Sequence, residues 1–308
     1  MSTSNNQYVE VDGEENDSDS ALGSDTQSIT TSIESTIKNH RWEHGRRYHN
    51  YEDGAYPFPN DELEQDRLDL MSHMMSLILG GKLHLTPIKN PTRILDIGTG
   101  TADEYPSADV LGNDITPIQP RWVPPNVKFE IDNVENDWPN RRNYSFIHCR
   151  CMPCTISNWP RLVEQCYEHT ETNGWAEFQD YDLVPYSEDG TLKPDNYITK
   201  MYDLLIQATK AGKMEPSPGP GLEKWLRNAG FKNVHHEVFK VPLGSWPKDP
   251  KLKKIGIINK AQFEDGLDGF LLRPYTKMLG WTNEEVQVFL AGVRKAVSDK
   301  DVHTLFDL

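Results

Sequence analysis

Acidic side chains and glycines follow two apolar runs of this chain at spacings that suit a nucleotide-like ligand. Residues 93–101 contain the acid Asp96 and then a turn with Gly98 and Gly100. Glycines in such a turn let the backbone come close to a ligand. A second apolar run ends at Asp114, near the offset of about 20 residues at which an acid meets a ribose hydroxyl. These positions predict a ligand site built from loop backbone and carboxylates.

Two more apolar runs end in polar groups. Residues 127–131 are followed by Asp132 and Asn133, and residues 144–149 contain His148. Short apolar runs between turns are typical of buried parallel strands, and ligands bind at the carboxyl edge of such sheets. We therefore predict an α/β fold whose strand ends meet at one edge. A glycine pair after a strand also occurs as a generic tight turn, so the acids that follow carry the prediction.

The charge of Asp96 separates two classes of cofactor. A carboxylate in the loop would repel the pyrophosphate of a dinucleotide, whereas it would attract the amino group and sulfonium of S-adenosylmethionine. The loop therefore favours S-adenosylmethionine. A nicotinamide-dependent oxidoreductase is the alternative, and the two differ in which cofactor protects the protein from thermal unfolding.

Nine short motifs extend this pattern along the chain, at residues 51–56, 59–62, 66–69, 81–83, 95–101, 117–120, 123–126, 173–175 and 280–282. Together they resemble the LaeA-like fungal S-adenosylmethionine-dependent methyltransferases, which are associated with secondary metabolism. The resemblance covers about residues 41–303. It implies a Rossmann-like class I methyltransferase sheet with helices on both faces, and transfer of a methyl group to an acceptor that the sequence does not identify.

The resemblance also implies a set of cofactor-binding residues. Carried over by match, they are Asp96, Gly98, Gly100, Thr101, Asp114, Ile115, Asp132 and Asn133. The loop residues correspond to the methionine end of the cofactor, Asp114 to its ribose, and Asp132 with Asn133 to its adenine side. A catalytic base is needed only if the acceptor loses a proton, so no catalytic residue is assigned. His148, Tyr51 and His49 are the conceivable bases, with structural roles as the plainer interpretation.

The sequence departs from the family pattern at two places. The pattern continues after Thr101 through a third glycine and about seven helical residues, which are missing here, and Ala102 stands at the glycine position. Residues 98–108 must then hold both turn and helix, where a crossover normally needs at least about 10 to 12 residues, so we predict a shortened first helix. The chain also ends where the pattern has a final strand, so we expect that strand to be missing, with residues 304–306 at most a stub.

The chain divides into a tail and one domain. Residues 1–37 hold eight acids and no basic residue, a composition that cannot bury enough apolar area to fold, so we predict a disordered acidic tail over residues 1–40. A methyltransferase-like domain is expected over residues 41–308. It comprises an N-terminal helical cap at 41–92 that folds over the pocket, a cofactor-binding core at 93–241 with an insertion at 180–221, and a C-terminal helical segment at 242–308.

Capping and breaker residues place the remaining elements. We predict helices that begin at Asn60 and Asn158 as N-caps, the second of them reaching roughly Thr170 before the breaker at residues 173–174, and further helices at residues 197–211 and 222–228. The fifth and sixth strands are expected at residues 175–179 and 234–241. A methionine-rich stripe at residues 71–75 indicates core packing, with an adaptable substrate pocket as the alternative.

Composition excludes several classes of function. The formal net charge of −15 argues against direct nucleic-acid binding, which needs clustered Lys and Arg. No apolar run is long enough for a membrane span and no secretion leader is recognisable, so we expect an intracellular protein of the cytoplasm or nucleus. Cys149, Cys151 and Cys154 have a spacing that suggests a metal, but no second cluster completes four ligands, so buried or loop thiols are the plainer interpretation.

A second class of function stays open at this point. Both departures fall on parts that the fold and the cofactor site use, so a degenerate domain that acts as a regulatory or protein-binding module is the alternative to an enzyme. The family includes regulators that join protein complexes. A segment lost from the gene model would leave the same signature. The acceptor is then either a small molecule or a protein.

Overall fold

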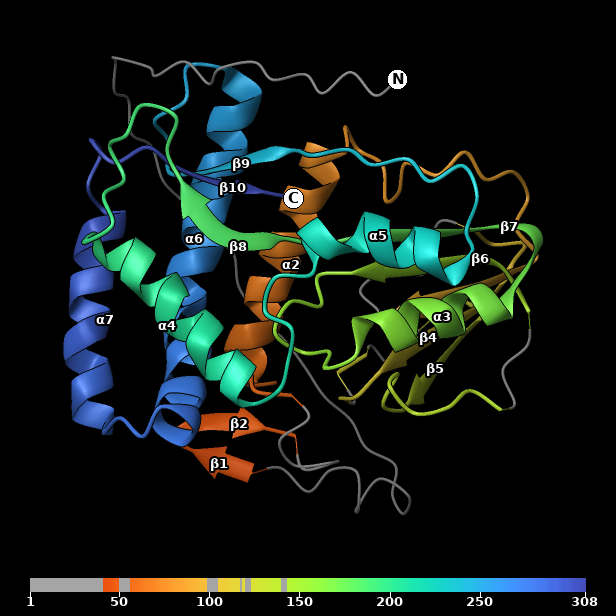
Figure 1. The fold of residues 1–308 in the computed structure, drawn as a ribbon, viewed down its shortest axis with the longest axis horizontal. Helices are drawn as coiled ribbons and strands as arrows, with labels where there is room; N and C mark the ends of the chain where they lie inside the picture. Colours follow the sequence, from red (N-terminus) through yellow and green to blue (C-terminus); the bar gives the residue numbers. More distant parts are fainter. Residues whose placement is uncertain (1–40, 50–55, 99–104, 117, 120–122, 140–142) are drawn as a thin grey trace.

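The structure of the chain is a computed structural model that describes residues 41–49, 56–98, 105–116, 118–119, 123–139 and 143–308. The predicted tail lies outside the described residues. So do Gly100 and Thr101 of the predicted cofactor loop, together with most of the segment in which a shortened first helix was expected. Figure 1 shows a parallel sheet on one side of the molecule and a group of helices on the other.

The parallel sheet has five strands, which confirms the predicted α/β architecture. They are β3 (Arg93–Ile97), β4 (Asp109–Asp114), β5 (Val127–Ile131), β6 (Tyr144–Arg150) and β7 (Thr170–Gln179), in the spatial order β5-β4-β3-β6-β7. Helices α3 (Trp159–His169) and α5 (Gly219–Ala229) pack against one face, where Leu95 and Ile97 meet Trp159 and Leu222. The apolar residues that predicted the strands are those buried in the sheet.

A second sheet overturns the expectation that the last strand is missing. It consists of β8 (Asp182–Tyr186), β9 (Lys240–Leu243) and β10 (Thr304–Asp307), with β10 antiparallel between the other two. Four residues suffice because both edges of β10 are paired, and because Leu305 and Phe306 are buried. Since β8 follows β7 after only two residues, β10 takes the place that the class I sheet gives to its final strand.

The predicted sixth strand is wrong over most of its length. Residues 234–239 are not part of a strand, and β9 begins only at Lys240. The ladder of this segment with β10 ends where Phe239 and Leu308 exchange hydrogen bonds of 2.9 and 3.0 Å. The residues before Phe239 therefore have no strand beside them in the described part of the chain.

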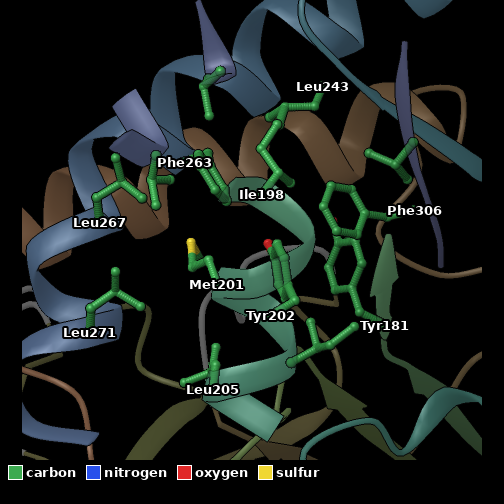
Figure 2. Packing of buried hydrophobic residues seen from close by; sticks show 14 of the residues in the cluster. Tyr181, Ile198, Met201, Tyr202, Leu205, Leu243, Phe263, Leu267, Leu271 and Phe306 are labelled. Atoms are coloured by element: carbon green, nitrogen blue, oxygen red, sulfur yellow. The ribbon is translucent and has the colours of Figure 1, made fainter. Parts of the chain in front are cut away.

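The helical half holds the largest apolar core. It is formed by α2 (Glu62–Ile78), α4 (Tyr197–Ala211), α6 (Pro250–Arg273), the π-helix η1 (Pro274–Met278) and α7 (Asn283–Val297). Figure 2 shows Met201 and Tyr202 of α4 lying between Phe263 of α6 and the rings of Tyr181 and Phe306. The short hairpin of β1 (Arg41–Glu43) and β2 (Arg46–Tyr48) lies at one end of this group.

One predicted helix boundary is corrected and another is confirmed. Asp61, rather than Asn60, caps α2, because its carboxylate accepts a hydrogen bond from the backbone of Glu64 and also pairs with Arg46 at 2.6 Å. Helix α3 ends at His169, within one residue of the predicted end near Thr170, and the chain enters β7 at once. Asn173 there has a φ of 66°, which belongs to an irregular stretch of that strand.

No helix among the described residues is both long and apolar enough to cross a membrane.

Candidate functional site

The carboxyl ends of β3, β4 and β5 bring several of the predicted site residues to one edge of the sheet. Asp96 lies in β3, Asp114 ends β4, and Asp132 follows β5. The backbone N–H of Asp132 donates to the carbonyl of Asp114 at 2.9 Å. Asp96 is also near enough to Asp114 to raise its pKa. The structure thus brings these three acids together, and their contact with a cofactor stays a prediction.

Gly98 begins the loop after β3 in a conformation that suits glycine. Its φ is +68°, and its N–H donates to the carbonyl of Asn113 at 2.9 Å. A Cβ atom at this position would lie 2.5 Å from the sulfur of Met152. Two observations therefore require glycine at this position: the positive φ angle, and the sulfur of Met152, which leaves no room for a Cβ atom.

Asp114 is held by the residues that follow it. Its Oδ1 accepts hydrogen bonds from the backbone N–H of Thr116 at 2.8 Å and from the hydroxyl of Thr116 at 2.9 Å. Burial raises the pKa of Asp114 to about 6, although the bonds from Thr116 and from the backbone of Ile115 act in the opposite direction. The carboxylate is therefore fixed in position and mostly ionised at pH 7 and above.

The pair predicted to contact the adenine is less enclosed. Asp132 and Asn133 are both half-buried, and the side-chain carbonyl of Asn133 accepts from the backbone of Glu135 at 3.0 Å. That bond fixes the turn after β5. The pair lies next to Asp114 along the edge, as the sequence predicted, with partly exposed polar atoms.

Asp96 has a partner that its position in the sequence did not indicate. The strand register places Asp96 opposite His148 of β6, and Oδ1 of Asp96 lies 2.8 Å from Nδ1 of His148. The Nε2 atom of His148 is buried and makes no hydrogen bond within the described part of the chain. His148 was a conceivable base in the sequence, and the structure shows its ring oriented by a carboxylate.

An apolar cavity of about 100 Å³ lies beside the end of β6. Cys151 and Thr155 bound it on the sheet side, and Tyr56, Arg67 and Met71 bound it on the side of the cap. Aromatic rings complete its wall, from Phe58, Tyr181, Tyr202, Phe263, Phe270 and Phe306. Residues 74 and 75 of the methionine-rich stripe are fully buried in the core, which confirms the core packing, whereas Met71 lines this cavity.

The charged groups at the cavity wall compensate one another. Arg67 and Glu64 are both almost fully buried, and the guanidinium contacts Oε1 of Glu64 at 2.6 Å. Burial alone would lower the pKa of Arg67, and the adjacent Glu64 carboxylate more than offsets this effect. Arg67 also donates to Gln262 at 2.9 Å, and Gln262 in turn donates to Asn259 at 2.8 Å. The cavity therefore presents a neutral wall.

Cys149, Cys154 and Cys166 are buried, and Cys151 is partly buried. Burial raises the pKa values of Cys151 and Cys154 to about 12 and that of Cys149 well above its ordinary value. Within the described ranges, no three His, Cys, Asp or Glu residues converge as a metal site requires. These thiols are protonated at neutral pH and act as small apolar side chains.

Comparison with known proteins identifies the family. A family model described as a methyltransferase domain matches residues 71–236. Methyltransferase pytC of Aspergillus terreus is 46% identical over 292 residues, which cover 92% of this chain and 90% of the relative. The secondary metabolism regulator LAE1 of Cochliobolus heterostrophus is 33% identical over 276 residues, covering 85% and 90%. The chain belongs to the LaeA-like fungal methyltransferases. The predicted resemblance is thereby confirmed.

The fold of this LaeA-like chain is that of the class I methyltransferases, with a central parallel sheet and flanking helices. Among solved structures, phosphoethanolamine N-methyltransferase 2 of Haemonchus contortus, in complex with phosphomonomethylethanolamine and S-adenosylhomocysteine, has a TM-score of 0.42 and 14% identity. The match covers 79% of this chain and 51% of that one.

Sequence reasoning missed several residues of the site in this LaeA-like chain. Asn113 receives the Gly98 hydrogen bond, and its buried side-chain nitrogen makes none with the described residues. Asp180 accepts from the backbone of Met152 at 2.9 Å, which holds Met152 against Gly98. Tyr56 lies near enough to Asp114 for the charge of that carboxylate to help raise the pKa of the tyrosine. Only Tyr56 had a signal, because it belongs to the first family motif.

Proposed function

We propose that the chain transfers a methyl group from S-adenosylmethionine to an acceptor in fungal secondary metabolism. One observation supports this most: a positive-φ glycine, a fixed carboxylate and a further acid meet at the carboxyl edge of β3, β4 and β5. This is the edge at which open α/β sheets bind ligands. The relatives named methyltransferases add weight to it. The acceptor is not identified.

The residues present fit this cofactor. The backbone at Gly98 leaves room for close approach, and the ionised carboxylate of Asp114 would accept hydrogen bonds from ribose hydroxyls. The unpartnered amide nitrogen of Asn113 offers a donor beside the loop, counted over the described residues. When bound, S-adenosylmethionine supplies an electrophilic methyl carbon. The protein contributes chiefly by holding the acceptor atom in line with it.

The cavity beside β6 is the place proposed for the acceptor group. It adjoins Tyr56, which lies near Asp114, so it borders the proposed cofactor edge. The tyrosines and cysteines that line it have raised pKa values, with burial as the main cause. None of them takes up a proton at neutral pH. If the acceptor loses a proton, the cavity wall therefore does not receive it.

A regulatory module without catalysis is the second candidate. It is favoured by the relative named a secondary metabolism regulator and by the residues missing after Thr101, where the family pattern places the cofactor loop and first helix. Such a module would act within a protein complex. Calorimetric titration of the purified chain with S-adenosylmethionine and its demethylated product distinguishes the two, because binding at micromolar level supports the enzyme.

Substituting Asp114 tests the proposed ribose contact. We expect Asp114→Ala to weaken S-adenosylmethionine binding at least ten-fold, or about 1.4 kcal/mol, with the fold intact. In the unsubstituted protein, the affinity should fall as the pH drops from 7 through about 6, because protonation removes the negative charge of the carboxylate and turns one of its acceptor oxygens into a donor. Calorimetric titrations at pH 7.5, 6 and 5 measure both effects.

The matched control is Asp109→Ala. Asp109 begins the same strand at the opposite edge and is exposed, so its loss should change neither the affinity nor its pH dependence.

The raised pKa of Asp114 fixes the direction in which both the stability and the affinity change with pH. Ionising Asp114 opposes folding, so the free energy of unfolding declines from about pH 4 to about pH 6, whereas binding needs the ionised form. Equal affinities for the Asp114→Ala protein and the unsubstituted protein would exclude the ribose contact.

A further inference from the structure

We propose that Arg67 makes the cavity beside β6 selective for an acceptor that carries a neutral carbonyl oxygen next to an apolar group. The inference rests on the proposed function, because it assigns a chemistry to the cavity in which the acceptor is expected. Arg67 belongs to α2 and lines this cavity, which has a volume of about 100 Å³. An apolar cavity of about 150 Å³ holds a benzene molecule, so this one takes a smaller group of the acceptor.

The guanidinium of Arg67 has hydrogen-bond donors to spare. An arginine side chain carries five N–H groups. Two of them donate to Oε1 of Glu64, at 3.0 and 2.6 Å, and one donates to Oε1 of Gln262 at 2.9 Å. The other two, one on each terminal nitrogen, have no partner among the described residues. A buried donor without a partner is costly, and an oxygen atom in the cavity would satisfy it.

Hydrogen bonds along the wall fix the direction in which its amides donate. Because arginine can only donate, Gln262 must face it with its carbonyl oxygen, and the amide nitrogen then donates to Asn259 at 2.8 Å. Asn259 in turn donates to the carbonyl of Pro242 at 2.9 Å. Gln262 and Asn259 are buried and line the cavity. The wall therefore offers N–H groups, and a ligand must supply the accepting oxygen.

A tyrosine hydroxyl adds a further donor. Figure 2 shows Tyr202 lying between Phe263 and the rings of Tyr181 and Phe306, all of which line the cavity. Burial raises the pKa of Tyr202, and the positive charge of Arg67 is near enough to act in the opposite direction. The hydroxyl is therefore protonated at neutral pH and offers an O–H donor close to the guanidinium.

The charges at the wall separate a carbonyl from an amine and from a carboxylate. Among the described residues that line the cavity, Arg67 carries the only charge and none is an acid. An ammonium group would meet a guanidinium, although the aromatic rings alone would suit a cation. A carboxylate would add an uncompensated negative charge, since Glu64 already balances Arg67. A neutral carbonyl accepts hydrogen bonds without either cost.

Helix α6 leaves room for the Arg67 side chain. Gly266 lies inside this helix, where glycine is less favourable than alanine. A Cβ atom there would lie 2.7 Å from Cδ of Arg67 and 2.6 Å from ring atoms of Phe270. The ring of Phe270 covers one face of the guanidinium, with its centroid 5.0 Å from Cζ. This packing fixes the guanidinium and leaves the N–H groups at its edge for hydrogen bonds.

The test compares two fragments that differ only in the oxygen, cyclopentanone and methylenecyclopentane. Binding to the full chain is followed by NMR of ¹³C-labelled methionine methyl groups, because Met71 lines the cavity. The loss of one signal in Met71→Leu assigns it. The measured quantity is the dissociation constant of methylenecyclopentane divided by that of cyclopentanone, and comparing this ratio between two proteins cancels the hydration of the fragments.

We expect the ratio to fall about ten-fold or more in Glu64→Leu/Arg67→Met, because a hydrogen bond from a charged donor is lost. Arg67→Lys keeps the charge opposite Glu64 and loses the planar fork, so it should lower the ratio about three-fold or more even if the double variant does not fold. The matched control is Leu68→Val, which changes the apolar lining and leaves every donor in place. Its ratio should stay within about two-fold of that of the unsubstituted protein.

The contrary outcomes are distinct from a failure of the proposed function. Equal ratios in the unsubstituted protein and the Arg67 variants would overturn the inference, as would a Met71 signal that does not respond to cyclopentanone. Tighter binding of tetramethylammonium than of cyclopentanone would identify a cation cage instead. None of these measurements needs S-adenosylmethionine. A chain that prefers cyclopentanone but does not bind S-adenosylmethionine in calorimetry would contradict the proposed function alone.

Discussion

Replacing Gly98 by alanine is expected to lower the affinity for S-adenosylmethionine by about 100-fold. Gly98 has a φ of +68°, at which an L side chain costs about 1–2 kcal/mol. The new Cβ would also lie 2.5 Å from the sulfur of Met152, so either the methionine or the loop must move. Displacing the loop misplaces the backbone that we propose lies next to the cofactor, and a misplacement of about 1 Å can cost about 100-fold. Calorimetric titration measures the affinity directly.

Two further variants separate the backbone strain from the collision. Gly190 has nearly the same φ, +72°, and nothing lies within 4 Å of a Cβ built on it. Gly190→Ala should therefore lower the free energy of unfolding without changing the affinity. The double variant Gly98→Ala/Met152→Ala removes the collision and keeps the strain, so it should recover part of the binding. An affinity of Gly98→Ala equal to that of the unsubstituted protein would show that this loop does not contact the cofactor.

The parallel sheet could be predicted from the sequence because its signal is local. Each strand from β3 to β6 is a short apolar run beside polar residues; β5 and β6 lie within one residue of their predicted bounds, and β4 ends at Asp114 as predicted. The acids at the ends of these runs meet because parallel strands share one carboxyl edge. Composition and spacing were therefore enough to predict that Asp96, Asp114 and Asp132 lie at neighbouring strand ends in the candidate site.

The parts that could not be predicted depend on partners far away in the sequence. β10 is a strand because β8 and β9, each more than 60 residues earlier, pair with both of its edges. Asn60 and Asp61 are equally good caps by composition, and the distant Arg46 selects Asp61. The Asp96–His148 pair follows from strand register, which neither residue reveals alone. The acceptor cavity joins the cap, the insertion and the C-terminal helices, so no single stretch encodes it.

Removing the carboxylate of Glu64 is expected to give the largest loss of stability. Arg67 is 5% exposed and Glu64 is 2% exposed, so Glu64→Ala leaves a buried guanidinium whose charge is no longer compensated. Breaking such a buried pair from one side costs about 3–5 kcal/mol. Denaturant unfolding measures this change. The control is Glu223→Ala, which breaks an exposed pair with Arg227 one helical turn away and should cost less than about 0.5 kcal/mol.

A double variant then shows what the pair contributes beyond stability. Replacing Glu64 by leucine and Arg67 by methionine removes both charges together, and such apolar replacements are often neutral or stabilising. We therefore expect Glu64→Leu/Arg67→Met to recover most of the free energy of unfolding lost in Glu64→Ala. Arg67 lines the cavity proposed for the acceptor. A stable double variant therefore shows what the loss of the Arg67 side chain does to acceptor binding when no uncompensated charge is left in the core. If the double variant is as unstable as Glu64→Ala, the instability comes from lost packing or hydrogen bonds to Gln262, and not from an uncompensated charge.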